Sequence, residues 1–447
     1  MSGANVRAPG PIPTAPSSIR RRGPEAVGFL NHLQPSPAQA GLPLYRSLLL
    51  AVAATLIALL LGEIGLRLAG QSYYWAFSKR PDPVLGWRPP PDSAAWQRFE
   101  GRALVETNAL GFRDLDHRLT KPAGSLRIAV LGDSFTEAVQ VALQQTWWRR
   151  MAAQLNSAGC PGIAPRTAPG DAPRSTEVLS FAVSGYSTAQ ALLAWRAHAR
   201  QFSPDVVILA LFIGNDLNEN VRALDSEPLR PYLVPARDGM RLDDGFLRSP
   251  EYRSATRRAG RALQWLREQS RIAQLLIQAR DAARMASLAA SNPEQHSAPQ
   301  EPGVDNALYQ PPNSPAWEAA WQTMQGILAA FSEETRAAAA EPLLMLIGTG
   351  AQVHPDSAGR ARFAAALGLE DLGYPVRRLL DIAHAHRIPV LNLPARWTQP
   401  SDQPPVFFHG LPGSMPGFGH WNANGHRAAG EAAAELICWL RSRPPPG

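Results

Sequence analysis

The chain has 447 residues, of which 45% are hydrophobic and 18% charged, so it can build a sizeable core and is not disordered throughout. Two cysteines are too few for a disulfide-rich mini-domain or a cysteine-based zinc module. The net charge of +7 comes almost wholly from scattered arginines, a pattern typical of a solvated surface, and we expect no nucleic-acid partner.

The first apolar feature along the chain is a candidate membrane anchor. Residues 1–43 are rich in Pro, Ala, Ser and Gly, which predicts a disordered tail. The uncharged run from Leu48 to Leu61, extended to Leu68, would span about 31 Å as a helix, enough for a hydrocarbon core of about 30 Å. A buried soluble helix is an alternative, but a helix that is apolar on all sides is typical of a membrane span. A cleaved signal peptide is another, but the leader is unusually long and no A-x-A site follows. We predict an uncleaved single-pass anchor over residues 44–69.

The segment that follows the anchor is predicted to be a Pro-rich linker over residues 70–100. Its aromatic residues suit a membrane interface, and the run Pro89-Pro90-Pro91 suits a stiff spacer. Flanking charges leave the orientation of the anchor open, because a large C-terminal domain can translocate regardless of charge.

The globular part, residues 101–447, alternates strands with helices. This alternation predicts an α/β fold with a parallel, doubly wound sheet. Residues 217–341 do not fit the repeat and are interpreted as a helical insertion that could form a cap beside the active site. The expected strands are Arg127–Leu131, Val178–Val183, Val206–Phe212, Pro342–Ile347 and Pro389–Leu393, and the last helix is Asn424–Leu440.

Four short polar motifs follow these strands. Because the carboxyl ends of parallel strands meet at one edge of a sheet, where α/β proteins bind ligands, we expect the motifs to converge. In chain order they are Gly132-Asp133-Ser134-Phe135, Ser184-Gly185-Tyr186, Gly214-Asn215-Asp216 and Gly419-His420-Trp421-Asn422.

These residue types suit acyl chemistry on a serine. Ser134 can attack a carbonyl carbon, and His420 can take its proton. The resulting oxyanion needs convergent donors, which the backbone N–H groups of Ser134 and Gly185 and the amide of Asn215 can supply.

With these four motifs in this order, the sequence resembles the SGNH/GDSL serine hydrolases over roughly residues 108–440. The four residues of the family signature correspond to Ser134, Gly185, Asn215 and His420. The resemblance implies a flavodoxin-like three-layer α/β/α sandwich with strand order 2-1-3-4-5. It also implies ester hydrolysis or acyl transfer through an acyl-serine, without a metal or other cofactor. The run from Asn108 to Arg113 looks like the lead-in of membrane-anchored bacterial members, with a plain turn before the first strand as the alternative.

One position departs from the family pattern. The family usually has an aspartate three residues before the histidine, and here that residue is Gly417. In a Ser-His-Asp triad, loss of the Asp function costs about 10⁴ in turnover. Three explanations stay open: a backbone carbonyl orients His420 in a dyad, a distant acid such as Asp402 substitutes, or the site is impaired. We prefer the dyad, because the other elements are complete.

Other polar residues are candidates for supporting roles. Asp133 is expected to accept turn N–H groups beside the nucleophile. His409 could line the site or be an ordinary loop histidine, and His426 is expected to pack in the first turn of the last helix. No acidic ligand accompanies these histidines at a recognised spacing, so we expect no metal.

The two cysteines bear on the compartment. In a 2-1-3-4-5 sheet, the helices that end near Cys160 and Cys438 pack on one face and run the same way. A disulfide would require their Cα atoms to lie within about 7 Å and an oxidising compartment, whereas two buried thiols are the alternative. The disulfide would favour a periplasmic domain on a cytoplasmic-membrane anchor.

Three functions are consistent with the sequence. The leading hypothesis is a membrane-anchored extracytoplasmic esterase acting on ester-linked acyl groups, with acylated cell-surface polysaccharide as a candidate substrate. The second is an O-acyltransferase that uses the same site to acylate a polysaccharide. The third, motivated by Gly417, is a non-catalytic binding or assembly protein on a hydrolase scaffold.

Overall fold

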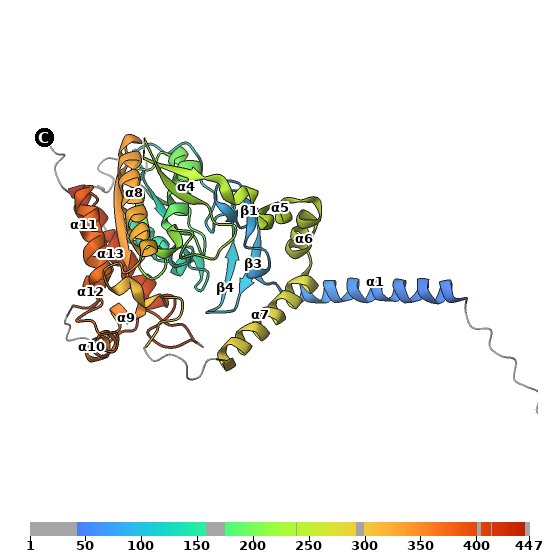
Figure 1. Ribbon diagram of the computed structural model, residues 1–447. Helices are drawn as coiled ribbons and strands as arrows, with labels where there is room; N and C mark the ends of the chain where they lie inside the picture. The colour runs from blue at the N-terminus through green and yellow to red at the C-terminus, as the bar shows by residue number, and fades with distance from the viewer. Residues whose placement is uncertain are drawn as a thin grey trace, which may run out of the picture. The chain divides into compact units, whose positions relative to one another are not determined.

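The protein is represented by a computed structural model that describes residues 43–157, 175–237, 239–291, 299–399, 404–412 and 414–442 (Figure 1). It divides into two compact units, Met1–Ile57 and Ala58–Gly447. The predicted tail over residues 1–43 lies almost wholly outside the described residues.

The candidate anchor is a single helix, α1 (Leu44–Leu68), of 25 residues. Its mean hydropathy reaches 2.3 and none of that stretch is buried, so by length and composition it could cross a membrane. This agrees with the predicted single-pass anchor, whereas neither the compartment nor the orientation follows from it.

A five-stranded parallel sheet forms the centre of the second unit. Its order is β11-β10-β7-β5-β6, which is the predicted order 2-1-3-4-5. The central strands are buried on both faces because their sequences are apolar at successive positions. The strands are β5 (Leu126–Leu131), β6 (Thr176–Ser180), β7 (Val206–Phe212), β10 (Glu341–Ile347) and β11 (Val390–Asn392).

Helices cover both faces of this sheet, so the predicted α/β/α sandwich is confirmed. Helices α3 (Trp147–Ser157) and α13 (Ala423–Ser442) pack together, and α4 (Thr188–Ala197) packs against α8 (Pro315–Ala337). A Cβ on Gly430 of α13 would lie 2.5 Å from the carbonyl oxygen of Trp147, so this glycine permits the close approach of α13 to α3.

The segment over residues 70–100 is folded rather than a linker. Tyr74 and Trp87 are buried in the domain. The Tyr74 hydroxyl donates to Glu137 Oε1 at 2.5 Å, and the Trp87 ring lies edge-on to Tyr186. The segment contains η1 (Tyr74–Ala76) and the hairpin strands β1 (Arg80–Asp82) and β2 (Gly86–Arg88), followed by β3 (Ala94–Gln97), which pairs with β4 (Ala103–Glu106).

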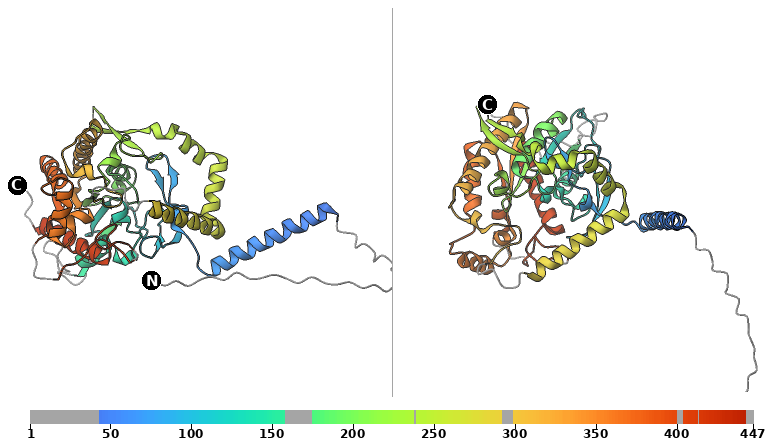
Figure 2. Two further views of the ribbon diagram at one scale, coloured as in Figure 1. Left: turned by 60° about the horizontal axis from the view of Figure 1, so that its bottom comes forward. Right: turned by 45° about the vertical axis from the view of Figure 1, so that its right-hand side comes forward.

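The segment between β7 and β10 contains an insertion and one helix of the sandwich, α8. The hairpin β8 (Tyr232–Ala236) and β9 (Gly239–Asp243) leads into the arm α5 (Pro250–Thr256), α6 (Arg258–Gln269) and α7 (Arg271–Ser291). This arm lies along one side of the sandwich, away from α11 (Tyr374–Ala385) and α13 (Figures 1 and 2). Helix α8, which the sequence places in the insertion, packs on β10 as the crossover between β7 and β10.

Short helices complete the described fold: α2 (Ser134–Glu137), η2 (Leu143–Gln145), η3 (Ala199–Phe202), η4 (Asn218–Asn220), η5 (Asp244–Arg248), η6 (Asn306–Tyr309), α9 (Gly350–Val353), α10 (Ser357–Ala366) and α12 (Leu393–Trp397).

Candidate active site

Ser134 begins α2 immediately after the central strand β5, as the G-D-S motif predicts. Asp133 caps this short helix, because its Oδ1 accepts from the N–H of Phe135 at 2.9 Å. Burial is the main cause that raises the pKa of Asp133 to about 6, although the Phe135 N–H opposes it. Asp133 therefore holds the turn, in line with its expected supporting role.

The imidazole of His420 meets the hydroxyl of Ser134 at the edge of the sheet. His420 Nε2 lies 2.9 Å from Ser134 Oγ, within hydrogen-bond distance. The His420 ring packs on Phe135, with ring centroids 5.1 Å apart, and its side chain is 28% exposed. The two side chains thus have the mutual geometry of a nucleophile and its base.

The partner of the other imidazole nitrogen is Glu100. Its Oε2 is hydrogen-bonded to His420 Nδ1, and its Oε1 accepts from the backbone N–H of His420 at 3.1 Å. Burial alone would raise the pKa of Glu100, but the hydrogen bonds and charge of His420 outweigh it and lower that pKa. A carboxylate therefore orients His420, which corrects the expectation of a backbone carbonyl.

The position of Glu100 explains why sequence reasoning missed it. Glu100 lies between β3 and β4, in the segment interpreted as a linker, so it comes before Ser134 in the chain and 320 residues before His420. The position of the usual family acid is Gly417, which has a φ of +87°. Asp402, the alternative acid considered from the sequence, lies outside the described residues.

The hairpin β3–β4 is fixed against the segment that follows α2. The buried Gln97 donates through Nε2 to the carbonyl of Glu100 at 2.7 Å. Gly101 has a φ of +71°, and a Cβ there would lie 2.4 Å from the carbonyl oxygen of Gln140. Only glycine fits this close approach without strain, so Gly101 is the local signal that could have marked the hairpin.

The expected oxyanion residues also lie at the ends of their strands. Gly185 follows β6 with a φ of +77°, and Asn215 follows β7. Among the described residues, the N–H groups of Ser134 and Gly185 donate to no protein acceptor. The Asn215 amide donates to Glu219 Oε1 at 3.2 Å. Their role as an oxyanion hole stays a prediction.

A buried arginine supports these donors from behind. Arg230 donates to the carbonyl of Gly185 at 2.7 Å, and it pairs with Asp225 at 2.5 Å and with Glu219 at 3.3 Å. Its side chain is 4% exposed. Because Glu219 holds Asn215 and Arg230 holds Gly185, the buried contact between Glu219 and Arg230 links two of the expected donors.

The pKa values of the carboxyl groups near Asn215 are strongly raised. Burial, supplemented by Asp133 and Asp225 and opposed by Arg230, raises the pKa of Glu219 to about 8. Burial and the charge of Asp133 raise the pKa of Asp216 well above its usual value. Asp216 Oδ2 accepts from the N–H of Phe212 at 2.9 Å, so Asp216 fastens the loop that presents Asn215.

His409 lies beside the site without touching Ser134 in any described contact. Its Nδ1 lies 2.6 Å from the carbonyl of Gly419, and its Nε2 accepts from Trp421 Nε1 at 3.2 Å. Burial lowers the pKa of His409 to about 4. The neutral ring therefore fixes the loop that carries His420. His426, in the first turn of α13, packs against Trp421, and burial lowers its pKa to about 3.

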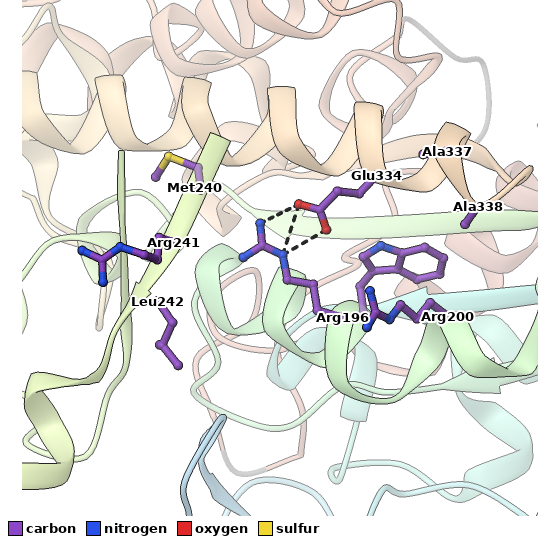
Figure 3. A pocket seen from close by; sticks show the side chains of 9 residues that line it. Arg196, Arg200, Met240, Arg241, Leu242, Glu334, Ala337 and Ala338 are labelled. Carbon is purple, nitrogen blue, oxygen red and sulfur yellow. Dashed lines mark hydrogen bonds and ion pairs between the residues drawn. The ribbon is translucent and has the colours of Figure 1, made fainter. Parts of the chain in front are cut away.

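A cavity of about 640 Å³ lies apart from the predicted site residues, between α4, β9 and α8 (Figure 3). Its lining includes Arg200 and the Arg196–Glu334 ion pair.

Within the described ranges, no cluster of three or more His, Cys, Asp or Glu side chains could hold a metal ion. Cys160 lies outside the described residues, so its disulfide with Cys438 stays a prediction.

Similarity to known proteins is found among solved structures only, and at low identity. No family model and no curated protein matches the sequence. Among solved structures, the chain is similar to an acetyl xylan esterase, AlAXEase, at 9% identity, covering 70% of this chain and 100% of that chain with a TM-score of 0.33. It is similar to the lipase/acylhydrolase from Enterococcus faecalis at 11% identity, covering 72% and 100% with a TM-score of 0.35. A GDSL-like lipase from Bacteroides thetaiotaomicron VPI-5482 matches at 11% identity, covering 70% and 87% with a TM-score of 0.30.

The sheet order and the four motif positions of this chain are those that the SGNH/GDSL resemblance implies. The chain therefore has the three-layer α/β/α sandwich that the resemblance implies, with Ser134 and His420 in contact at one edge of its sheet.

Glu100→Gln tests the role of the carboxylate. The variant keeps the shape of the side chain but cannot stabilise an imidazolium, so we expect kcat for ester hydrolysis to fall by about 10⁴-fold. The matched control is Glu106→Gln, at an exposed position on β4 of the same hairpin, with unchanged turnover. If the Glu100→Gln variant had a normal kcat and a normal melting temperature, the role of Glu100 would be contradicted and Ser134 and His420 would act as a dyad.

Arg230→Met tests the buried ion pair behind the donors. Removal of the guanidinium leaves the buried carboxyl groups without their cation and the Gly185 carbonyl without the Arg230 donor, so we expect a loss of about 3–5 kcal/mol in the free energy of unfolding. Arg222→Met removes a 57% exposed arginine that pairs with Asp243 at 3.7 Å, and should cost under about 1 kcal/mol. Urea titration of the full chain measures both, and equal losses would contradict the assigned role of Arg230.

The raised pKa of Glu219 predicts a pH dependence of stability. The folded chain keeps this proton up to about pH 8, whereas the unfolded chain loses it near the ordinary value of 4.5. The free energy of unfolding contributed by Glu219 is therefore present at low pH and is lost as pH rises toward 8. We expect Glu219→Gln, which mimics the neutral acid, to gain stability relative to the parent chain between pH 5 and pH 8. A constant difference across urea titrations at these pH values would refute this.

Proposed function

We propose that this chain is a membrane-anchored serine esterase of the SGNH type, which acts on ester-linked acyl groups through an acyl-serine intermediate. The observation that carries the proposal is the hydrogen-bonded chain from Ser134 Oγ through His420 to the Glu100 carboxylate. It combines a nucleophile, a base and a group that orients the base.

The reaction proceeds in two halves. Ser134 Oγ attacks the acyl carbon while His420 Nε2 takes the hydroxyl proton, and Glu100 stabilises the imidazolium. The N–H groups of Ser134 and Gly185 and the Asn215 amide donate to the oxyanion. His420 then gives its proton to the departing alcohol, which leaves the acyl group on Ser134. In the second half, an incoming hydroxyl loses its proton to His420 as its oxygen bonds to the acyl carbon. The bond between the acyl carbon and Ser134 Oγ then breaks, and His420 returns the proton to Ser134 Oγ.

Water and a sugar hydroxyl are alternative acceptors for this acyl-enzyme. The 28% exposure of the His420 side chain favours access by either, so O-acylation of a polysaccharide is the second candidate. The hypothesis of a non-catalytic binding protein rested on the missing acid at Gly417. Glu100 supplies a carboxylate to His420, so that reason for the hypothesis no longer holds.

The same proposal places the catalytic domain in the periplasm, on the outer side of the cytoplasmic membrane. Helix α1 supports the anchor by its length and apolar composition. Acylated cell-surface polysaccharide is then an accessible substrate, and the predicted disulfide between Cys160 and Cys438 would suit that compartment.

Ser134→Ala tests the nucleophile directly. Loss of the hydroxyl removes the acyl-enzyme route, so we expect hydrolysis of a short-chain acyl ester to fall by about 10⁶-fold with an unchanged melting temperature. Ser93→Ala, in the loop before β3, is the control and should retain activity. Equal rates for Ser134→Ala and the parent chain would refute the proposal. Product analysis with an added oligosaccharide separates acyl transfer from hydrolysis.

A further inference from the structure

Two helices of the arm, α6 and α7, expose large apolar side chains that no described residue covers. Trp265 is 62% exposed and Leu276 is 66% exposed. Leu263 and Leu266 are three positions apart on α6, so they lie on one side of that helix. The exposed large apolar residues of the arm are Leu263, Trp265, Leu266, Leu275, Leu276 and Met285.

The junction between α6 and α7 is bound to the last turns of α1, within one compact unit. The Glu63 carboxylate accepts from the N–H groups of Arg271 at 2.9 Å and Ile272 at 3.1 Å, which caps the start of α7. Arg67 pairs with Glu63 at 2.9 Å and donates to the carbonyl of Gln269. Because this point lies at the end of the candidate membrane span, the arm begins where a bilayer surface would be.

The opposite side of α7 is fastened to the domain. Gln274 is fully buried and accepts from the N–H of Tyr73 at 3.2 Å. The Tyr73 hydroxyl donates to Asp281 at 3.3 Å. These contacts use one side of α7 and leave the side with Leu275 and Leu276 exposed.

The charge of the arm complements an anionic lipid surface. Residues 257–287 contain seven arginines and only two acids, Glu268 and Asp281. Arginine side chains near an anionic leaflet are attracted to its negative surface potential, and tryptophan is enriched at the membrane–water interface. The arginines are Arg257, Arg258, Arg261, Arg267, Arg271, Arg280 and Arg284.

From the apolar side chains, the Glu63 cap and the arginines together, we infer that α6 and α7 lie in the interface of an anionic bilayer as a second, monotopic membrane contact. The side chains of Leu263, Trp265, Leu266, Leu275 and Leu276 enter the acyl boundary, while the arginines bind lipid phosphates. This contact rests on the proposed anchoring by α1, and it would hold the catalytic domain against the membrane instead of leaving it on a free tether.

Photo-crosslinking to lipid tests this contact in the full chain. The chain is reconstituted in vesicles of phosphatidylcholine and phosphatidylglycerol that carry a diazirine on the acyl chain, irradiated, and mapped by peptide mass spectrometry. We expect adducts on α1 and also on α6 and α7. Trp265→Asp/Leu276→Asp should lose the adducts on α6 and α7 and keep those on α1. Trp265→Ala/Leu276→Ala should reduce them without a change in helical content. Leu119→Asp, at a 56% exposed leucine before β5, should change nothing.

The outcomes separate this inference from the proposed function. Adducts on α1 without adducts on α6 and α7 overturn the interfacial contact and leave the anchor and the esterase intact. Protection of α6 and α7 from hydrogen exchange to the same extent in detergent and in vesicles shows that protein covers this face, and it also overturns the inference. Absence of adducts on α1 contradicts the anchor itself, whereas ester hydrolysis by the same sample reports separately on Ser134.

Discussion

The pairing of Glu100 with the imidazole of His420 is the interaction on which the site depends. It joins a hairpin near the start of the globular part to the loop before the last helix, two segments that share no strand pairing. His420 lies on a loop and its side chain is 28% exposed, so packing alone would leave the ring several orientations. The Glu100 carboxylate accepts hydrogen bonds from Nδ1 and from the backbone N–H of His420, which restricts both the ring and the loop. The 2.9 Å approach of His420 Nε2 to Ser134 follows from that restriction.

The sheet could be predicted from the sequence because its information is local. Strands such as Val206–Phe212 are continuous apolar runs, and the motifs of Ser134, Gly185 and Asn215 each follow a strand closely, so parallel order brings these three residues to one edge of the sheet. His420 lies on a longer segment between β11 and α13. The acid could not be predicted in this way. Glu100 stands in a short hairpin, outside the strand–helix repeat, and its distance from His420 in the chain carries no periodic signal. The prolines and aromatics around it indicated a linker, whereas Tyr74 and Trp87 pack inside the domain.

The polar network behind the expected oxyanion donors has a cost that folding must offset. Burying Asp133, Asp216, Glu219 and Arg230 removes their hydration, and the raised pKa of Glu219 reports part of that cost. An apolar core would be more stable at this place, but it could not hold the Gly185 carbonyl or the Asn215 amide in one orientation. The network therefore costs stability and fixes the orientation of the expected donors, as the proposed reaction would require. Arg230 lies in the insertion after β7, just before β8. The insertion therefore contributes a side chain that holds Gly185, whether or not it also forms a cap.

The segment over residues 70–100 connects helix α7 to the residues of the candidate site. Tyr73 fastens α7, Tyr74 donates to Glu137 on the helix that begins with Ser134, and Glu100 orients His420. Any displacement of this segment would move the base and the support of the nucleophile together. The folded domain therefore includes residues that composition alone assigns to a linker. A domain boundary drawn after residue 100 would remove the carboxylate that orients His420 and the buried rings of Tyr74 and Trp87, so the domain boundary lies between the end of α1 and Tyr73.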